Sequence, residues 1–261
     1  MREKVNGFVG VMAVAILCMV SGLCMVWGIA PVVLAVYVAA CAVCGRYMIT
    51  CIGCAAGVAA GSMGIAGLLH AYEYMIPGPV YSGVMVTEKY LVLLGLAMCL
   101  MKIVYSRNSR SYVRVIVVMS AAVLMGNIVV YADNMLMAAA YGVVEAAIFM
   151  CASVILKPGI GLLYTYICGD ASDVERDESW NISQGIVSLM ALAAVVLWVV
   201  PGEDIYGVNP AFMLALVLIL YAVYRTGAVY GCGMAAVAGS IVSVKLNDSR
   251  WLMWMLLVTC L

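Results

Sequence analysis

Glu145 is the residue whose position most directly suggests chemistry. It lies in the middle of the apolar run AYGVVEAAIFM, where inserting a charged side chain into a membrane costs about 3 kcal/mol. Such a carboxyl group is expected to face the interior of a helix bundle, either protonated or paired. Asn127 and Lys102 are its candidate partners. The pattern predicts either an ion or proton site or a structural polar contact between helices, and we favour the structural contact.

Four cysteines have the spacing C-x2-C-x6-C-x2-C, which is compatible with a zinc or iron–sulfur site: Cys41, Cys44, Cys51 and Cys54. Their neighbours are small or apolar residues, without the turn chemistry that shapes a ligand loop. We therefore expect these thiols to pack as small apolar groups, with no metal bound and no cofactor. The single histidine, His70, lies at the edge of an apolar segment, and no nucleophile–base pair stands out. An enzymatic activity is not expected of this chain.

The composition predicts an integral membrane protein. Of 261 residues, 67% are hydrophobic and 10% are charged, and the mean hydropathy is +1.14. So few charges cannot cover the surface of a water-soluble globule, which excludes a soluble enzyme and a disordered chain. Basic and acidic residues balance at 13 each, so no bulk field attracts nucleic acid.

Apolar segments recur along the chain and predict an all-α, polytopic bundle with about nine or ten membrane segments in a single membrane domain over 1–261. The expected segments are 8–28, 30–44, 47–69, 87–106, 112–132, 134–156, 182–200, 211–225, 227–244 and 250–261. The first is expected to be retained rather than cleaved as a signal peptide. The second is short and expected to be tilted or partly inserted. The last stops before it crosses a bilayer, which favours a fragment or a truncated gene.

The distribution of charge predicts a cytoplasmic N-terminus. The basic cluster Lys102, Arg107, Arg110 and Arg114 marks the loop between the fourth and fifth segments as cytoplasmic by the positive-inside rule. Alternation then makes 169–181 an acidic cytoplasmic loop, read as a solvated connection. Lys245 and Arg250 are exceptions, because they fall in a turn that is expected to be external.

Glycines at helical spacing indicate close helix packing. Small residues let neighbouring backbones approach where no hydrophobic driving force exists, as inside a membrane. These glycine faces also lead us to expect a homo-oligomer. The six candidate packing glycines are Gly53, Gly57, Gly61, Gly227, Gly231 and Gly239.

Three stretches give the chain a resemblance to a known family. They are GIAPVVLAVYVAACAVCGRYMITCIGCAAGVAAG (28–61), ISQGIVSLMALAA (182–194) and YRTGAVYGCGMAAVAGSIVSV (224–244). Their order and hydrophobic pattern resemble the N-terminal membrane region of stage II sporulation protein E from endospore-forming bacteria. One departure is Gln184-Gly185, where the family usually has an acidic pair. The resemblance covers no part of the family's metal-dependent phosphatase-2C-type domain, whose chemistry is therefore not carried over.

The resemblance implies membrane anchoring, self-association and localisation to the polar division septum of a sporulating bacterium. In the family this region anchors the phosphatase that activates the forespore sigma factor. Implied partners are the lipid bilayer, a second copy, cell-division ring proteins or a phosphatase on a separate chain. We expect a non-catalytic, multi-pass module of the cell membrane. The alternatives are a small transporter or transporter subunit that uses Glu145, and a gene fragment without an independent role.

Overall fold

A computed structural model describes residues 2–23, 31–72, 83–104, 109–132, 134–168, 182–200, 209–246, 248 and 250–259. The predicted all-α class is confirmed for these ranges, where every regular element is a helix. The predicted acidic loop 169–181 lies outside the described residues. The chain divides into two compact units, Met1–Trp180 and Asn181–Leu261, and each is described by itself. The expected single membrane domain remains a prediction.

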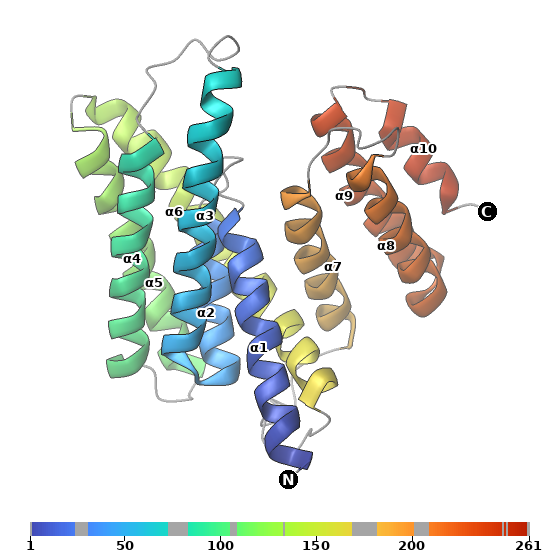
Figure 1. The fold of residues 1–261 in the computed structure, drawn as a ribbon, viewed down its shortest axis with the longest axis horizontal. Helices are drawn as coiled ribbons and strands as arrows, with labels where there is room; N and C mark the ends of the chain where they lie inside the picture. Colours follow the sequence, from blue (N-terminus) through green and yellow to red (C-terminus); the bar gives the residue numbers. More distant parts are fainter. Residues whose placement is uncertain are drawn as a thin grey trace. The chain divides into compact units, whose positions relative to one another are not determined.

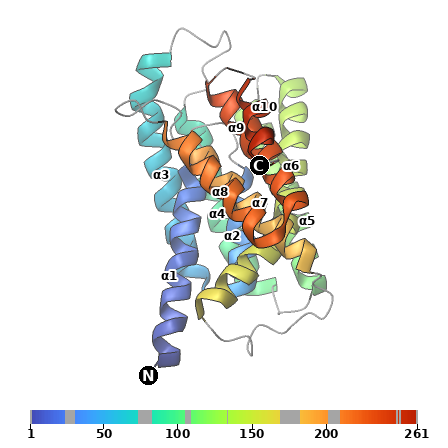
Figure 2. The same ribbon diagram turned by 90° about the vertical axis from the view of Figure 1, so that its right-hand side faces the viewer.

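The first unit contains the helices α1 (Arg2–Leu23), α2 (Pro31–Cys44), α3 (Tyr47–Tyr72), α4 (Gly83–Val104), α5 (Ser109–Val130) and α6 (Met135–Cys168). Helix α1 packs along α3, and both views show these two helices side by side (Figures 1 and 2). Helix α6 packs along α5 and α2, while α4 packs against α3, α5 and α2. The polar residues of interest lie on the connected set α4, α5 and α6.

Helix α2 is short and occupies the centre of this unit. Its 14 residues extend about 21 Å, less than the hydrocarbon core of roughly 30 Å. All eleven residues from Pro31 to Cys41 are buried, because α1, α3, α4 and α6 all pack against it. A helix that is apolar on every side is expected in such a position.

Helix α6 is longer than the segment predicted at 134–156. It continues through Pro158 to Cys168, a length of 34 residues. The Lys157-Pro158-Gly159 sequence suggests a break. Neighbouring helices in a membrane bundle nevertheless help a helix to tolerate proline, and the residues that follow are again apolar. At the other end the Asn134 side chain caps α6 by accepting a hydrogen bond from the Met137 amide at 3.2 Å.

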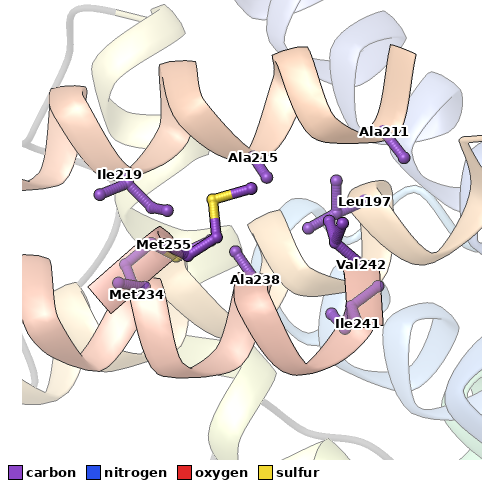
Figure 3. Packing of buried hydrophobic residues seen from close by; sticks show 10 residues of the cluster. Leu197, Ala211, Ala215, Ile219, Met234, Ala238, Ile241, Val242 and Met255 are labelled. Atoms are coloured by element: carbon purple, nitrogen blue, oxygen red, sulfur yellow. The ribbon is translucent and has the colours of Figure 1, made fainter. Parts of the chain in front are cut away.

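The second unit contains α7 (Ile182–Val199), α8 (Pro210–Thr226), α9 (Ala228–Leu246) and α10 (Arg250–Val258). Its core lies between α8 and α9 and is completed by Leu197 of α7 and Met255 of α10 (Figure 3). The Asn209 side chain caps α8 by accepting a hydrogen bond from the Phe212 amide at 2.9 Å. Pro210 occupies the first turn, where its missing N–H costs nothing.

Three described helices are long and apolar enough to cross a membrane: Ser111–Val130, Met135–Ile167 and Ala228–Leu246. Five shorter apolar helices accompany them in the described ranges. Many large apolar side chains are exposed on these helices, among them Val129, Leu136, Val229 and Val237. Exposed apolar surface of this extent is typical of a protein that contacts lipid.

Candidate functional site: a buried lysine–glutamate–asparagine contact

The candidate site lies where α4, α5 and α6 meet, and each of these helices contributes one face to it. On α4, Lys89 belongs to the stripe that continues with Leu93, Ala97 and Met101, all of them buried. The four residues are four positions apart, so they share one helix face. The adjacent Glu88 is exposed. Lys89 is therefore buried because it lies on the face of α4 that packs against the neighbouring helices.

Three polar side chains make direct contact at this point. The Lys89 Nζ lies 2.7 Å from Oε2 of Glu145, and it donates a second hydrogen bond to Oδ1 of Asn127 at 3.1 Å. The Asn127 Nδ2 donates to the same Glu145 Oε2 at 2.7 Å and to the Val123 carbonyl at 3.1 Å. Each residue thus contacts the other two, and Asn127 is also tied to its own helix.

Two glycines make room for this contact. A Cβ added at Gly126 would lie 3.3 Å from Cγ and Cδ of Lys89, so the lysine stem crosses α5 over Gly126. A Cβ at Gly142 would lie 3.3 Å from Cγ of Leu124 and 3.5 Å from Cβ of Asn127. Helix α6 therefore approaches α5 closely at Asn127. Close approach across small residues is the usual basis of helix association in membranes.

Burial makes the electrostatics of this contact important. The side chain of Lys89 is 4% exposed and that of Glu145 is 19% exposed. One positive and one negative charge at 2.7 Å cancel each other's field, which removes much of the cost of embedding either one. Removal of one partner would leave the other as an uncompensated buried charge. Each of the two charges is therefore stabilised in this buried position only while the other is present.

Tyr90 is the fourth polar group of the site. The Lys89 ammonium lies 4.7 Å from the centre of its ring, a cation–π contact. Its hydroxyl is completely buried and makes no hydrogen bond of ordinary geometry among the described residues. It interacts with the Glu145 side chain both electrostatically and through a looser hydrogen bond. Tyr90 is therefore a further partner of Glu145 at the edge of the contact.

The structure brings together two of the three predicted polar residues, Glu145 and Asn127. The cation that contacts them is Lys89, whereas Lys102 is exposed in the last turn of α4. The two lysines are 13 positions apart, about 20 Å along a helix, so they cannot serve the same point. In the sequence Lys89 follows the polar residues Thr87 and Glu88, so it resembles the hydrophilic end of a membrane segment and not a buried residue. Leu93, Ala97 and Met101 show in the structure that this face is buried, but α4 is apolar on nearly every side, so the sequence gives little signal for it.

The six predicted packing glycines do not all have the same role. Gly53 and Gly57 face α1, where an added Cβ would strike the backbone of Ala15 and Met19 respectively. Gly231 packs against Val223, and Gly61 and Gly239 are buried. Gly227 is the exception, because it caps α8 with φ of 87° and has open space around its Cβ position. A left-handed backbone explains glycine there, rather than close packing.

The cysteine spacing forms no cluster of metal ligands within the described ranges. No group of three or more His, Cys, Asp or Glu side chains there is placed to hold a metal ion. Cys41 and Cys54 are buried, and Cys41 Sγ lies 3.2 Å from the Thr50 hydroxyl. Both thiols thus belong to the packing of α2 and α3.

Comparison with known proteins gives no relative. No protein-family model, no curated protein and no solved structure matches the chain. The site must therefore be interpreted from its own chemistry. It holds the Lys89 ammonium between a carboxylate and an amide oxygen, an arrangement in which the two opposite charges compensate each other.

Proposed function

We propose that the chain is a non-catalytic, multi-pass membrane module that anchors and self-associates at the polar division septum of a sporulating bacterium. It would do so as the membrane region of stage II sporulation protein E does. The observation that supports an anchor is the internal compensation of the buried charges. Lys89, Asn127 and Glu145 contact one another, which is what a permanent structural contact in a scaffold requires.

The proposed membrane arrangement has about nine or ten segments and a cytoplasmic N-terminus. It follows from assigning to the cytoplasmic side, by the positive-inside rule, the basic cluster that includes Lys102 in the last turn of α4 and Arg114 near the beginning of α5. Lys245 and Arg250 remain exceptions to that rule. The Lys245 ammonium donates to the carbonyls of Leu197 and Val200, and Arg250 pairs with Asp248 at 2.8 Å.

Self-association would have to use other surfaces than the Gly53–Gly57 face. These glycines already face Ala15 and Met19 of the same chain. The exposed apolar faces of the membrane helices remain for a second copy. We therefore do not expect two copies of the chain to associate through Gly53 and Gly57.

A fluorescent fusion of the full chain tests the proposal in a sporulating endospore-forming bacterium. We expect enrichment at the polar septum and, for the purified protein in mild detergent, a mass by light scattering above that of the monomer. A fusion of an unrelated multi-pass protein of similar size is the control for uneven membrane staining. Uniform membrane fluorescence together with a monomeric mass would contradict the proposal.

A further inference from the structure

Helices α1 and α3 approach each other so closely that their backbones are in contact. A Cβ added at Gly53 would lie 2.6 Å from the carbonyl oxygen of Ala15, and a Cβ added at Gly57 would lie 2.9 Å from Cα of Gly22. Both views show the two helices side by side (Figures 1 and 2). Side chains that face each other within this stretch are therefore nearer than those of helices packed through larger residues.

Two cysteines face each other within this stretch, Cys18 of α1 and Cys54 of α3. Both side chains are completely buried, and the Cys18 thiol is hydrogen-bonded to that of Cys54. Neither forms a disulfide in this structure. A disulfide joins residues whose Cα atoms are about 4.4–6.8 Å apart, and helix backbones in contact allow such a separation. The two cysteines can therefore be linked without a large movement of either helix.

The neighbouring cysteines have other contacts. Cys41 and Cys51 interact electrostatically with Cys18. The Cys41 Sγ, however, lies 3.2 Å from the hydroxyl of Thr50. Among the described cysteines it is Cys54 whose thiol contacts that of Cys18 directly. The reactive unit is therefore a pair that joins α1 to α3, and not the four-cysteine spacing of α2 and α3.

Helix α1 is held in the first unit by one face only. It packs mainly on α3, whereas its opposite face exposes apolar side chains, among them Met12, Ile16 and Met19. Cys18 lies on the packed face. A covalent bond from Cys18 to α3 would therefore hold a helix that is otherwise kept in place by packing alone. Because both thiols are buried, a reagent reaches them when α1 separates transiently from α3.

We propose that Cys18 and Cys54 are a redox-sensitive pair, which a low-molecular-mass disulfide oxidises to a disulfide bond that holds α1 on α3. One cysteine attacks the reagent R–S–S–R as its thiolate, forms a mixed disulfide and displaces RS⁻, which takes up the proton that the cysteine lost. The other cysteine attacks the protein sulfur of the mixed disulfide and displaces the second RSH. Two protein thiols are oxidised and one R–S–S–R is reduced to two RSH. The inference does not depend on septal anchoring.

The first test maps the disulfides of the purified wild-type chain in mild detergent. A brief pulse of N-ethylmaleimide caps exposed thiols, such as those of Cys99, Cys151 and Cys232, and excess bis(2-hydroxyethyl) disulfide is then added. Mass spectrometry of peptic peptides, prepared without reduction, identifies the linked cysteines. We expect the Cys18–Cys54 link to exceed every other protein disulfide at least about tenfold, because packing holds these two thiols together. Absence of this link, or equal yields of other links, would overturn the proposal.

The second test measures whether the link holds α1 in place. Oxidation should raise the Tm of the wild-type chain by roughly 5–10 °C, and reduction with dithiothreitol should reverse the increase. Cys99→Ala removes an exposed thiol of α4 and should show the same increase, whereas Cys18→Ala and Cys54→Ala should show none. An increase that persists in Cys18→Ala would contradict the assignment of the pair. A linked wild-type chain with an unchanged Tm would contradict the effect on α1.

Discussion

The ammonium of Lys89 and the carboxylate of Glu145 are 2.7 Å apart although 56 positions of sequence separate them. Breaking a buried pair on one side leaves an uncompensated charge, whereas replacing both partners by apolar residues removes the charges together. We expect Lys89→Met and Glu145→Met each to lower the free energy of unfolding by about 3 kcal/mol. The double variant should recover more than half of that loss. Unfolding in mixed micelles of increasing denaturing-detergent content measures all three.

Lys102→Met is the matched control for this cycle. It changes the same residue type on the same helix, but at an exposed position in the last turn. Its effect should stay within about 0.5 kcal/mol, as for most surface substitutions. A loss at Lys102 equal to that at Lys89 would contradict the assignment of Lys89 as the partner of Glu145.

Lys102 and Lys89 also show which parts of the candidate site could be predicted from the sequence. An acid at position 145 inside an apolar run must face the interior, and an amide on the preceding segment is a natural partner. Both statements follow from the cost of burying a charge. The choice between two lysines of one helix depends on which face packs inward. That face is fixed by tertiary contacts of Leu93, Ala97 and Met101, and a nearly uniformly apolar segment shows little amphipathic contrast from which to infer it.

Gly57 and Gly95 provide a second test. An added Cβ at Gly57 would strike the Met19 carbonyl on α1, whereas one at Gly95 meets nothing within 4 Å. Gly57→Ala should therefore push α1 from α3 and cost about 1–3 kcal/mol of stability, a typical penalty for overpacking. Gly95→Ala should be neutral or stabilising by up to about 1 kcal/mol, because alanine favours the helix. The same unfolding experiment in mixed micelles compares the two.

A neutral Gly57→Ala would mean that α1 and α3 are not in close contact. The α1–α3 contact could be predicted only in part. The four-residue spacing of Gly53 and Gly57 indicates a close neighbour. It does not say whether that neighbour is another helix of the same chain or a second copy, since both fit the same groove.

Lys245 of α9 provides a third test. Its ammonium donates to the carbonyls of Leu197, at 3.1 Å, and of Val200 at the carboxyl end of α7. These carbonyls lack helical partners, and the helix dipole favours a cation there. Lys245→Met should reduce stability by about 1–2 kcal/mol and increase hydrogen–deuterium exchange in the last turn of α7. Arg250→Gln, at an exposed ion pair, should change α7 exchange little.

The exchange experiment distinguishes this role from a general loss of stability. Faster exchange confined to 195–200 in Lys245→Met is the result expected of a lost cap. Equal acceleration throughout 182–259 would contradict it. The sequence shows only that position 245 carries a charge. Its carbonyl partners could not be predicted, because only the fold brings α9 beside the end of α7.

The pair Asp248–Arg250 predicts a pH dependence of known sign. Hydrogen bonds from the Arg250 side chain, with one from its backbone amide, lower the pKa of the Asp248 carboxyl below its usual range. A pKa lowered by folding contributes stability above the ordinary value of about 3.9 and loses it as pH falls through the folded value. The Arg250 side chain is 82% exposed and that of Asp248 28%, so solvent screens the pair and the contribution is small. NMR of the Asp248 carboxyl carbon follows the titration directly.

Arg250→Gln should return the Asp248 titration toward the ordinary carboxyl range, because it removes the guanidinium donors and the positive charge. Lys102→Gln also removes one positive charge from the chain but none from Asp248, so it should leave that titration unchanged. High salt should also raise the pKa of Asp248 in the wild-type chain, since an exposed pair is screened. An Asp248 titration that is the same in Arg250→Gln and wild type would show that Arg250 is not the cause of the shift.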